Sequence, residues 1–355
     1  MTVDLSSLGW DDDFAAAYAA LDRPDRRPGR VVRADRGVCT VLTQAGPVRA
    51  SLSGGLLGAA ARDPVALPCA GDWVAVCTWP DERITVDAVL PRRAAIVRRT
   101  AGKQSEGQVL AANLDAAAVV EPMDPEPDLG RIERLLSLAW ESGAPPLVVL
   151  TKADLAADPD TVAEQVSGST PGVPVYPISA RTGVGLDVLR PLVTRGRTLG
   201  LLGPSGAGKS TLVNALARAT VMVTQTMRND SKGRHTTTYR ALIPMPGGGA
   251  VLDTPGIRAV GLLDSARGLA KTFADVEEIS LACRFGDCSH RGEPGCAVEA
   301  AMESGDLAPR RLESWRKLQR ELAFETRRRD ARLAAEERAK WKRISKEVRA
   351  KGSRP

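Results

Sequence analysis

The sequence has few aromatic residues and no long apolar run. Phe, Trp and Tyr make up only 4% of the 355 residues, so we expect cores built from Val, Leu, Ile and Ala. No stretch of 18 or more apolar residues occurs, which argues against a transmembrane helix. The N-terminus is acidic and has no basic stretch followed by an apolar one, so we expect no signal peptide. These absences favour a cytoplasmic protein that has no membrane partner.

Histidine is nearly absent, and half of the cysteines lie close together. There are two histidines and six cysteines, and three of the cysteines fall within 14 residues that also contain one histidine. Thiols stay reduced in the cytosol, so such a group indicates metal ligands rather than disulfides. Three thiolates and one imidazole suit a closed, structural Zn²⁺ site, here formed by Cys283, Cys288, His290 and Cys296. The alternative is three buried cysteines beside an incidental histidine.

The basic character of the chain is concentrated at its C-terminal end. Residues 309–355 contain 17 Lys and Arg against seven Asp and Glu, whereas the rest of the chain is slightly acidic. A dense basic segment on an acidic protein fits a polyanionic partner such as RNA. A solvated helix without a partner is the alternative that charge alone leaves open.

Short alternating runs predict a small β-barrel near the N-terminus. Residues 1–28 are expected to be a weakly ordered extension with one short helix around Phe14–Leu21. Residues 29–100 contain five short apolar runs separated by Gly, Pro and Asp, which is typical of an OB-fold. The expected strands are Arg30–Ala34, Val38–Leu42, Val48–Leu52, Trp73–Thr78 and Ile84–Leu90.

After a connector at Thr100–Gln108, the pattern changes to alternating strands and helices. Continuous apolar runs such as Ala116–Glu121 and Pro146–Leu150 indicate buried parallel strands, with an amphipathic helix at Gly130–Ser142 between them. We therefore expect an α/β domain over residues 109–275. A small helical zinc-binding domain is expected over 276–325, followed by a basic helical tail over 326–355.

A phosphate-binding loop follows the predicted strand Thr198–Leu202. Residues 203–210 match the pattern G-x-x-x-x-G-K-[ST] and open a predicted helix, which is the context that the motif requires. Backbone N–H groups of such a loop surround the phosphates, the lysine contacts the β- and γ-phosphates, and the hydroxyl binds Mg²⁺. The expected nucleotide-binding residues are Gly203, Pro204, Ser205, Gly206, Ala207, Gly208, Lys209, Ser210 and Thr211, with Lys209 also catalytic and Ser210 a magnesium ligand.

Two further strand ends predict a site for guanine. Thr151-Lys152-Ala153-Asp154 resembles the N-K-x-D motif of GTPases, in which the Asp accepts two hydrogen bonds that adenine cannot supply. Thr151 departs from the usual Asn. Ser179 and Ala180 resemble the second loop that contacts the base. An ATPase is the alternative that Asp154 opposes.

The residues that sense the γ-phosphate are expected after the phosphate loop. Asp253-Thr254-Pro255-Gly256 resembles the D-x-x-G motif, and Thr237 is expected to complete the magnesium shell with Ser210. Ile257 occupies the position where many GTPases have a water-orienting Gln, so His235 is the candidate for that catalytic role.

The order of these motifs is circularly permuted. The guanine motifs at 151 and 179 precede the phosphate loop at 203, whereas ordinary GTPases have the opposite order. This order, the sequence Gly233–Thr238 and the Cys283–Cys296 cluster together resemble the bacterial small-ribosomal-subunit-dependent GTPase A family (RsgA, also called YjeQ) over about residues 29–325.

The resemblance implies a GTP hydrolase that acts late in maturation of the small ribosomal subunit. It implies binding of the subunit and its 16S rRNA in the GTP state, and release after ribosome-stimulated hydrolysis to GDP. One structural Zn²⁺ and Mg²⁺ with GTP are the implied cofactors, and we expect a monomer. The alternative function is a zinc and OB-fold RNA-binding protein whose nucleotide site only binds.

Overall fold

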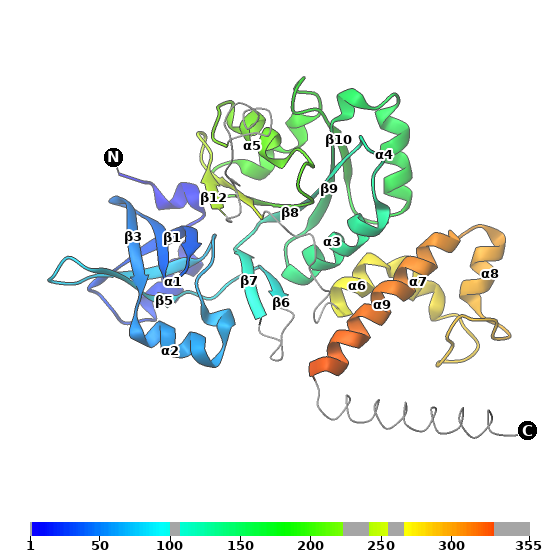
Figure 1. The fold of residues 1–355 in the computed structure, drawn as a ribbon, viewed down its shortest axis with the longest axis horizontal. Coiled ribbons are helices and arrows are strands. Elements are labelled where there is room, and N and C mark those ends of the chain that lie inside the picture. The colour runs from blue at the N-terminus through cyan, green and yellow to red at the C-terminus, as the bar shows by residue number, and fades with distance from the viewer. Residues whose placement is uncertain (1, 100–106, 223–240, 255–265, 330–355) are drawn as a thin grey trace, which may run out of the picture.

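A computed structural model describes residues 2–99, 107–222, 241–254 and 266–329 (Figure 1). The chain forms a β-barrel at one end, an α/β region in the middle and a group of helices at the other end. This arrangement confirms the three-part fold predicted from the sequence. No helix among the described residues is long and apolar enough to cross a membrane.

The N-terminal strands close into the predicted five-stranded barrel. Strand β1 pairs with both β2 and β4, β2 pairs with β3, β3 pairs with β5, and β5 pairs with β4. A ring of pairings leaves no free edge, which is the architecture of an OB-fold. Helix α2 and a short 3-10 helix, η2, connect β3 to β4. The elements are β1 (Arg26–Asp35), β2 (Val38–Thr43), β3 (Gly46–Leu52), α2 (Gly54–Arg62), η2 (Pro64–Ala66), β4 (Trp73–Thr78) and β5 (Ile84–Val89).

The N-terminal extension is ordered, contrary to the expectation for its residues. It forms a 3-10 helix η1 (Leu5–Leu8) and a helix α1 (Asp12–Ala19), which Asp11 caps by accepting a hydrogen bond from the Phe14 N–H. The Trp10 ring lies 4.9 Å from that of Trp73 on the barrel. The predicted short helix around Phe14–Leu21 overlaps α1, but the expectation of weak order was wrong. The aromatic side chains pack against the barrel, and local composition does not reveal this tertiary contact.

A buried arginine joins the extension to the barrel and to the segment beyond it. Arg30 on β1 is 1% exposed, and its guanidinium donates hydrogen bonds to the carbonyls of Leu8, Gly71 and Asn113. Burial lowers the pKa of Arg30 to about 10. The charge is stabilised by these carbonyls and by the Trp73 ring, whose centroid lies 5.3 Å from the guanidinium carbon.

A hairpin occupies the connector between the barrel and the α/β region. Strand β6 (Ala95–Arg99) pairs with β7 (Gly107–Ala112) as a separate two-stranded sheet. The sequence predicted neither strand, because each apolar run is short and lies beside the connector. Residues 100–106 between them are outside the described ranges.

The central sheet has the strand order β10-β9-β8-β11-β13-β12. All neighbours are parallel except β12, which is antiparallel to β13. Apolar clusters on its two faces are covered by α3 and α4 on one side and α5 on the other. The elements are β8 (Ala116–Pro122), α3 (Leu129–Ser142), β9 (Pro146–Thr151), η3 (Ala153–Leu155), α4 (Pro159–Gly168), β10 (Val175–Ile178), η4 (Leu186–Val188), η5 (Arg190–Val193), β11 (Thr198–Leu202), α5 (Lys209–Ala217), β12 (Ala241–Pro244) and β13 (Ala250–Asp253).

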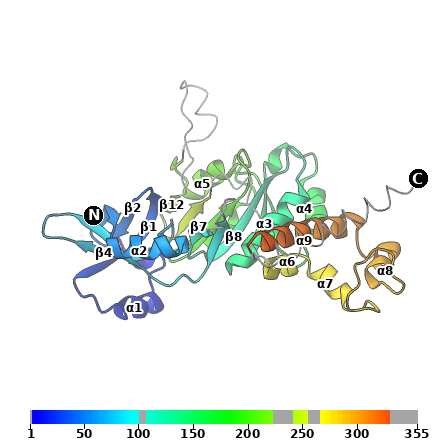
Figure 2. The same cartoon turned by 60° about the horizontal axis from the view of Figure 1, so that its bottom comes forward.

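The C-terminal helices share one apolar core. They are α6 (Ala266–Thr272), α7 (Ala274–Ser280), α8 (Ala297–Ser304) and α9 (Pro309–Arg329). This core includes Leu269 and Phe273, so the helical region extends ahead of residue 276, where the sequence suggested its start. Figure 2 shows α9 lying along α3 and α6. The tail beyond residue 329 is outside the described ranges.

Candidate functional site

The predicted phosphate loop connects β11, in the middle of the sheet, to helix α5. Gly203 lies so close to β8 that a Cβ atom there would be 2.2 Å from the Val120 carbonyl oxygen. Gly206 and Gly208 have φ values of +85° and +83°, which favour glycine. The motif glycines therefore let the backbone turn tightly at the start of α5, where N–H groups can bind an anion.

Lys209 is held inside the loop. Its side chain is largely buried, and its ammonium donates hydrogen bonds to the Gly203 carbonyl at 2.9 Å and the Pro204 carbonyl at 2.7 Å. Ser210 and Thr211 follow in the first turn of α5. This arrangement places a cation beside the N–H groups of the loop.

Asp253 ends β13, the strand next to β11. The residue is 3% exposed, and its Oδ1 has no hydrogen-bond partner among the described residues. Burial raises the pKa of Asp253, and the charge of Lys209 opposes that rise. A buried carboxylate oxygen without a partner fits a site for a hydrated cation such as Mg²⁺.

The predicted guanine loops meet beside the phosphate loop. Ser179, at the end of β10, donates a hydrogen bond from its hydroxyl to Asp154 Oδ1 at 2.6 Å. The other carboxylate oxygen of Asp154 lies 3.2 Å from Arg181 Nε. The Ser179 hydroxyl, with a smaller contribution from Arg181, lowers the pKa of Asp154. Asp154 is therefore held as an ionised acceptor, and Ala180 lies between its two partners in the same loop.

Thr151 connects the two halves of the site. It is 2% exposed, and its hydroxyl donates a hydrogen bond of 2.6 Å to the carbonyl of Ala207 in the phosphate loop. The Lys152 backbone is left-handed, with φ +60°, and its ammonium donates to the Asp124 carbonyl at 2.7 Å. The hydroxyl thus makes a direct contact with the phosphate loop from the position where Asn is usual.

Two participants in this geometry were not predicted from the sequence. Arg181 pairs with Asp154, and the Asp124 carbonyl binds Lys152. The only sequence signal for the Arg181–Asp154 contact was that Arg181 follows Ser179 and Ala180 directly. The second is a backbone group, for which the side-chain sequence carries no signal.

The four predicted metal ligands converge in the C-terminal helical region. The ligand atoms of Cys283, Cys288, His290 and Cys296 all lie within 4.8 Å of one another. His290 Nδ1 lies 3.6 Å from Cys283 Sγ and 3.4 Å from Cys296 Sγ. This cluster can hold a metal ion, and its thiols and imidazole are the donors that Zn²⁺ prefers.

Three predicted site residues lie outside the described ranges. They are His235, Thr237 and Gly256, and their roles stay predictions from the sequence.

A family model and several curated proteins resemble this chain. Residues 89–263 match the family model described as RsgA GTPase. The chain is 53% identical to "Small ribosomal subunit biogenesis GTPase RsgA" of Streptomyces coelicolor, over 92% of this chain and 89% of that protein. It is 43% identical to the protein of the same name from Opitutus terrae, over 92% of each chain.

Two solved structures have the same fold. YjeQ from Thermotoga maritima is 26% identical with a TM-score of 0.59, covering 84% of this chain and 99% of that one. YloQ, described as a circularly permuted GTPase, has a TM-score of 0.58 at 24% identity, covering 84% of this chain and 96% of that one. Its fold agrees with the permuted order of strands and motifs seen here. The phosphate loop, the permuted sheet and these similarities together show that the chain belongs to the RsgA GTPase family.

Proposed function

We propose that this chain hydrolyses GTP while bound to the small ribosomal subunit, as a late factor in the maturation of that subunit. One observation carries the enzymatic part: the Thr151–Ala207 hydrogen bond brings the base-reading and phosphate-binding loops into one site. The relatives' shared name supports the ribosomal part. Stimulation of GTP hydrolysis by purified small subunits tests the proposal.

Each part of the site has a proposed role toward the nucleotide. The N–H groups of residues 203–208 bind the phosphates, and Lys209 neutralises charge that develops on the γ-phosphate during hydrolysis. Asp154 accepts hydrogen bonds from guanine, while Lys152, Ser179 and Ala180 complete the base site. Gly256 is proposed to contact the γ-phosphate.

Mg²⁺ would be held by Ser210, Thr237 and, through water, Asp253. Bound there, it would stabilise negative charge on the phosphate oxygens. The unpartnered Oδ1 of Asp253 supports this assignment. The proposed role of His235, orienting the attacking water, rests on the sequence alone.

The Thr151 hydroxyl is proposed to position the guanine loop against the phosphate loop. Thr151→Val removes the hydroxyl with little change of shape, and it leaves the Ala207 carbonyl without this donor. In Thr151→Val the two loops can move apart so that water reaches this carbonyl, and nucleotide binding must then restore the buried arrangement. An unsatisfied buried group costs roughly 1–3 kcal/mol, so we expect affinity for both GTP and GDP to fall by up to roughly 5- to 150-fold. Titration with fluorescent nucleotides measures the effect, and Thr151→Ser is the matched control. Equal affinity of the Val and Ser variants would contradict this role.

We infer that the Cys283–Cys296 cluster binds one structural Zn²⁺. Four protein ligands leave no open position, so the ion would stabilise the C-terminal helices rather than react. Cys288→Ser is expected to lower the zinc content well below one per chain and to reduce the melting temperature of this region. Metal analysis and calorimetry measure both. Cys77→Ser, which changes a barrel cysteine, serves as the control and should retain zinc. Full zinc retention in the Cys288 variant would argue against the assigned ligand set.

The proposed partner is 16S rRNA within the small subunit, contacted by a monomer in the cytoplasm. The basic segment beyond residue 309 and the OB-type barrel both suit a polyanion. The alternative of a nucleotide site that only binds is less well supported. The burial of Lys209 and Asp253 beside the phosphate loop supports hydrolysis instead, because these are the residues proposed to act on the γ-phosphate and Mg²⁺.

A further inference from the structure

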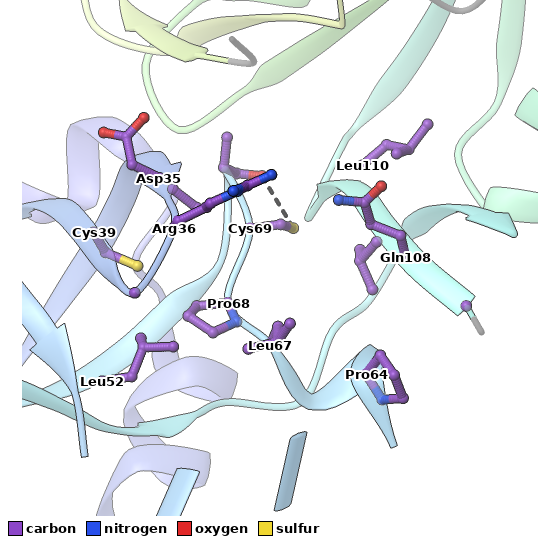
Figure 3. Close-up of a pocket in the computed structure, with 15 residues that line it drawn as sticks. Asp35, Arg36, Cys39, Leu52, Pro64, Leu67, Pro68, Cys69, Gln108 and Leu110 are labelled. Atoms are coloured by element: carbon purple, nitrogen blue, oxygen red, sulfur yellow. Dashed lines mark hydrogen bonds between the residues drawn. The ribbon is translucent and has the colours of Figure 1, made fainter. Parts of the chain in front are cut away.

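A pocket of about 460 Å³ lies outside the nucleotide site (Figure 3). It is enclosed by the β1–β2 turn, the end of β3, the connector from Pro64 to Ala70, and strand β7. This volume is in the range of sites that bind small molecules. The β1–β2 loop of an OB-fold is one of the places where such barrels bind oligonucleotides.

The wall of the pocket formed by the connector is rigid. Arg92 donates hydrogen bonds to the carbonyls of Val65 at 2.6 Å and Leu67 at 2.8 Å. The same guanidinium pairs with Asp72 through two contacts of 2.7 Å, and the Asp72 side chain is fully buried and also accepts the Cys69 N–H. A buried, paired network of this kind fixes the connector before any ligand arrives.

The opposite wall is held against this connector by close packing. A Cβ atom on Gly107, at the start of β7, would lie 2.8 Å from a methyl group of Val65. A Cβ atom on Gly71 would lie 2.2 Å from the Ala112 carbonyl oxygen. The hairpin and the barrel are therefore closely packed against each other beside the pocket.

The lining combines apolar side chains with a few polar ones. Leu52, Leu67 and Pro68 supply the apolar part. Figure 3 shows Arg36 reaching over the pocket from the β1–β2 turn, with the Gln108 amide on the β7 side. The neighbouring carboxylate of Asp35 is paired with Arg33, whereas no ion pair joins Arg36 to a described residue. The lining of the pocket therefore includes a guanidinium suited to a phosphate.

We propose that this pocket receives one unstacked nucleobase of an RNA strand, with Arg36 contacting the adjoining phosphate and Gln108 the edge of the base. The inference rests on the proposed binding of ribosomal RNA and adds a specific contact to it. Apolar side chains such as those of the pocket pack against the faces of an unstacked base, and an amide reads a base edge through both donor and acceptor.

Affinity for purified small subunits tests the proposal. Gln108→Trp fills the pocket from an exposed wall position, and Arg36→Ala removes the phosphate contact. Gln108→Trp is expected to weaken subunit binding by roughly 5- to 150-fold, the range for losing one base contact. Arg36→Ala is expected to weaken it by roughly 10-fold or more, the range for losing one hydrogen bond to a charged group. Arg49→Ala is the control, because it removes an exposed barrel arginine that does not line the pocket. This variant should bind subunits within about twofold of wild type, since it loses only a general attraction to RNA phosphates.

A photo-crosslinking amino acid at position 67, which lines the pocket and is exposed, identifies the occupant. We expect an adduct with subunits that ribonuclease removes and that Gln108→Trp suppresses. An adduct to ribosomal protein alone, or equal subunit affinity of the Gln108, Arg36 and Arg49 variants, would overturn the pocket while leaving RNA binding intact. Calorimetric binding of free AMP or GMP that Gln108→Trp abolishes, without loss of subunit affinity, would assign the pocket to a free nucleotide instead. Failure of wild type to bind subunits at all would overturn the proposed function as well.

Discussion

Asp154→Asn is expected to lower GTP affinity by roughly 100-fold and to favour xanthosine triphosphate over GTP. Guanine offers two donors, its ring N–H and its amino group, and a carboxylate accepts both, whereas an amide accepts one and opposes the other. Leaving a polar group unsatisfied in a site built to bind it produces discrimination of this size or greater. Xanthine has a carbonyl in place of the amino group, so the amide of Asn matches it.

Competition against a fluorescent GTP analogue, at neutral pH, measures these affinities. Because the pKa of Asp154 is lowered, its carboxylate is ionised at neutral pH, and the affinities of wild type and variant are compared without a change of protonation at this residue. Asp158→Asn is the matched control, because Asp158 is an exposed carboxylate that caps α4. Equal affinity of wild type for GTP and ATP would remove the guanine assignment.

Glu133→Ala is expected to destabilise the contact between the α/β region and the C-terminal helices by about 3–5 kcal/mol. Glu133 on α3 is fully buried and accepts hydrogen bonds from Arg310 at 2.8 Å, Arg311 at 2.9 Å and the Ser314 hydroxyl. Arg311 is itself 3% exposed and also binds Asp275 at 2.8 Å. Removing Glu133 leaves a buried guanidinium short of one carboxylate, which costs more than losing a surface pair.

Calorimetry of the full chain follows the melting of the helical region. Arg190→Ala breaks an exposed pair with Asp187 and should change the melting temperature little. A double variant with an apolar residue in place of Glu133 and Met in place of Arg311 removes both buried charges. If it recovers much of the stability that Glu133→Ala loses, the loss is due to the uncompensated charge of Arg311. A Glu133→Ala variant that melts like the Arg190 control would show that this network does not hold the helices in place.

The sequence was sufficient for features that depend on local pattern. The strands of the barrel and sheet follow from alternating or continuous apolar runs, and the phosphate loop follows from glycines that permit left-handed backbone. The Cys283–Cys296 cluster was predicted because cysteine and histidine are rare enough in this chain for their clustering to be informative.

Features that depend on tertiary contact were missed. Arg30 lies on β1 and reads from the sequence as an exposed charge, yet three carbonyls from separate segments surround it. Glu133 likewise lies in an amphipathic helix where a carboxylate is expected to face water, and its partners are about 180 residues away. No local rule connects such residues, because their burial is decided by how the three regions pack.

The central claim is that this site hydrolyses GTP and that the small ribosomal subunit stimulates it. Steady-state phosphate release, with and without purified small subunits, tests both halves for wild type, Lys209→Ala, His235→Ala and the exposed control Lys317→Ala. We expect large stimulation in wild type and Lys317→Ala. In Lys209→Ala we expect almost complete loss of GTP hydrolysis. In His235→Ala we expect loss of the stimulation by small subunits, because the proposed role of that residue is to orient the attacking water. Wild-type hydrolysis that small subunits do not change, or stimulation that survives in Lys209→Ala, would contradict the account.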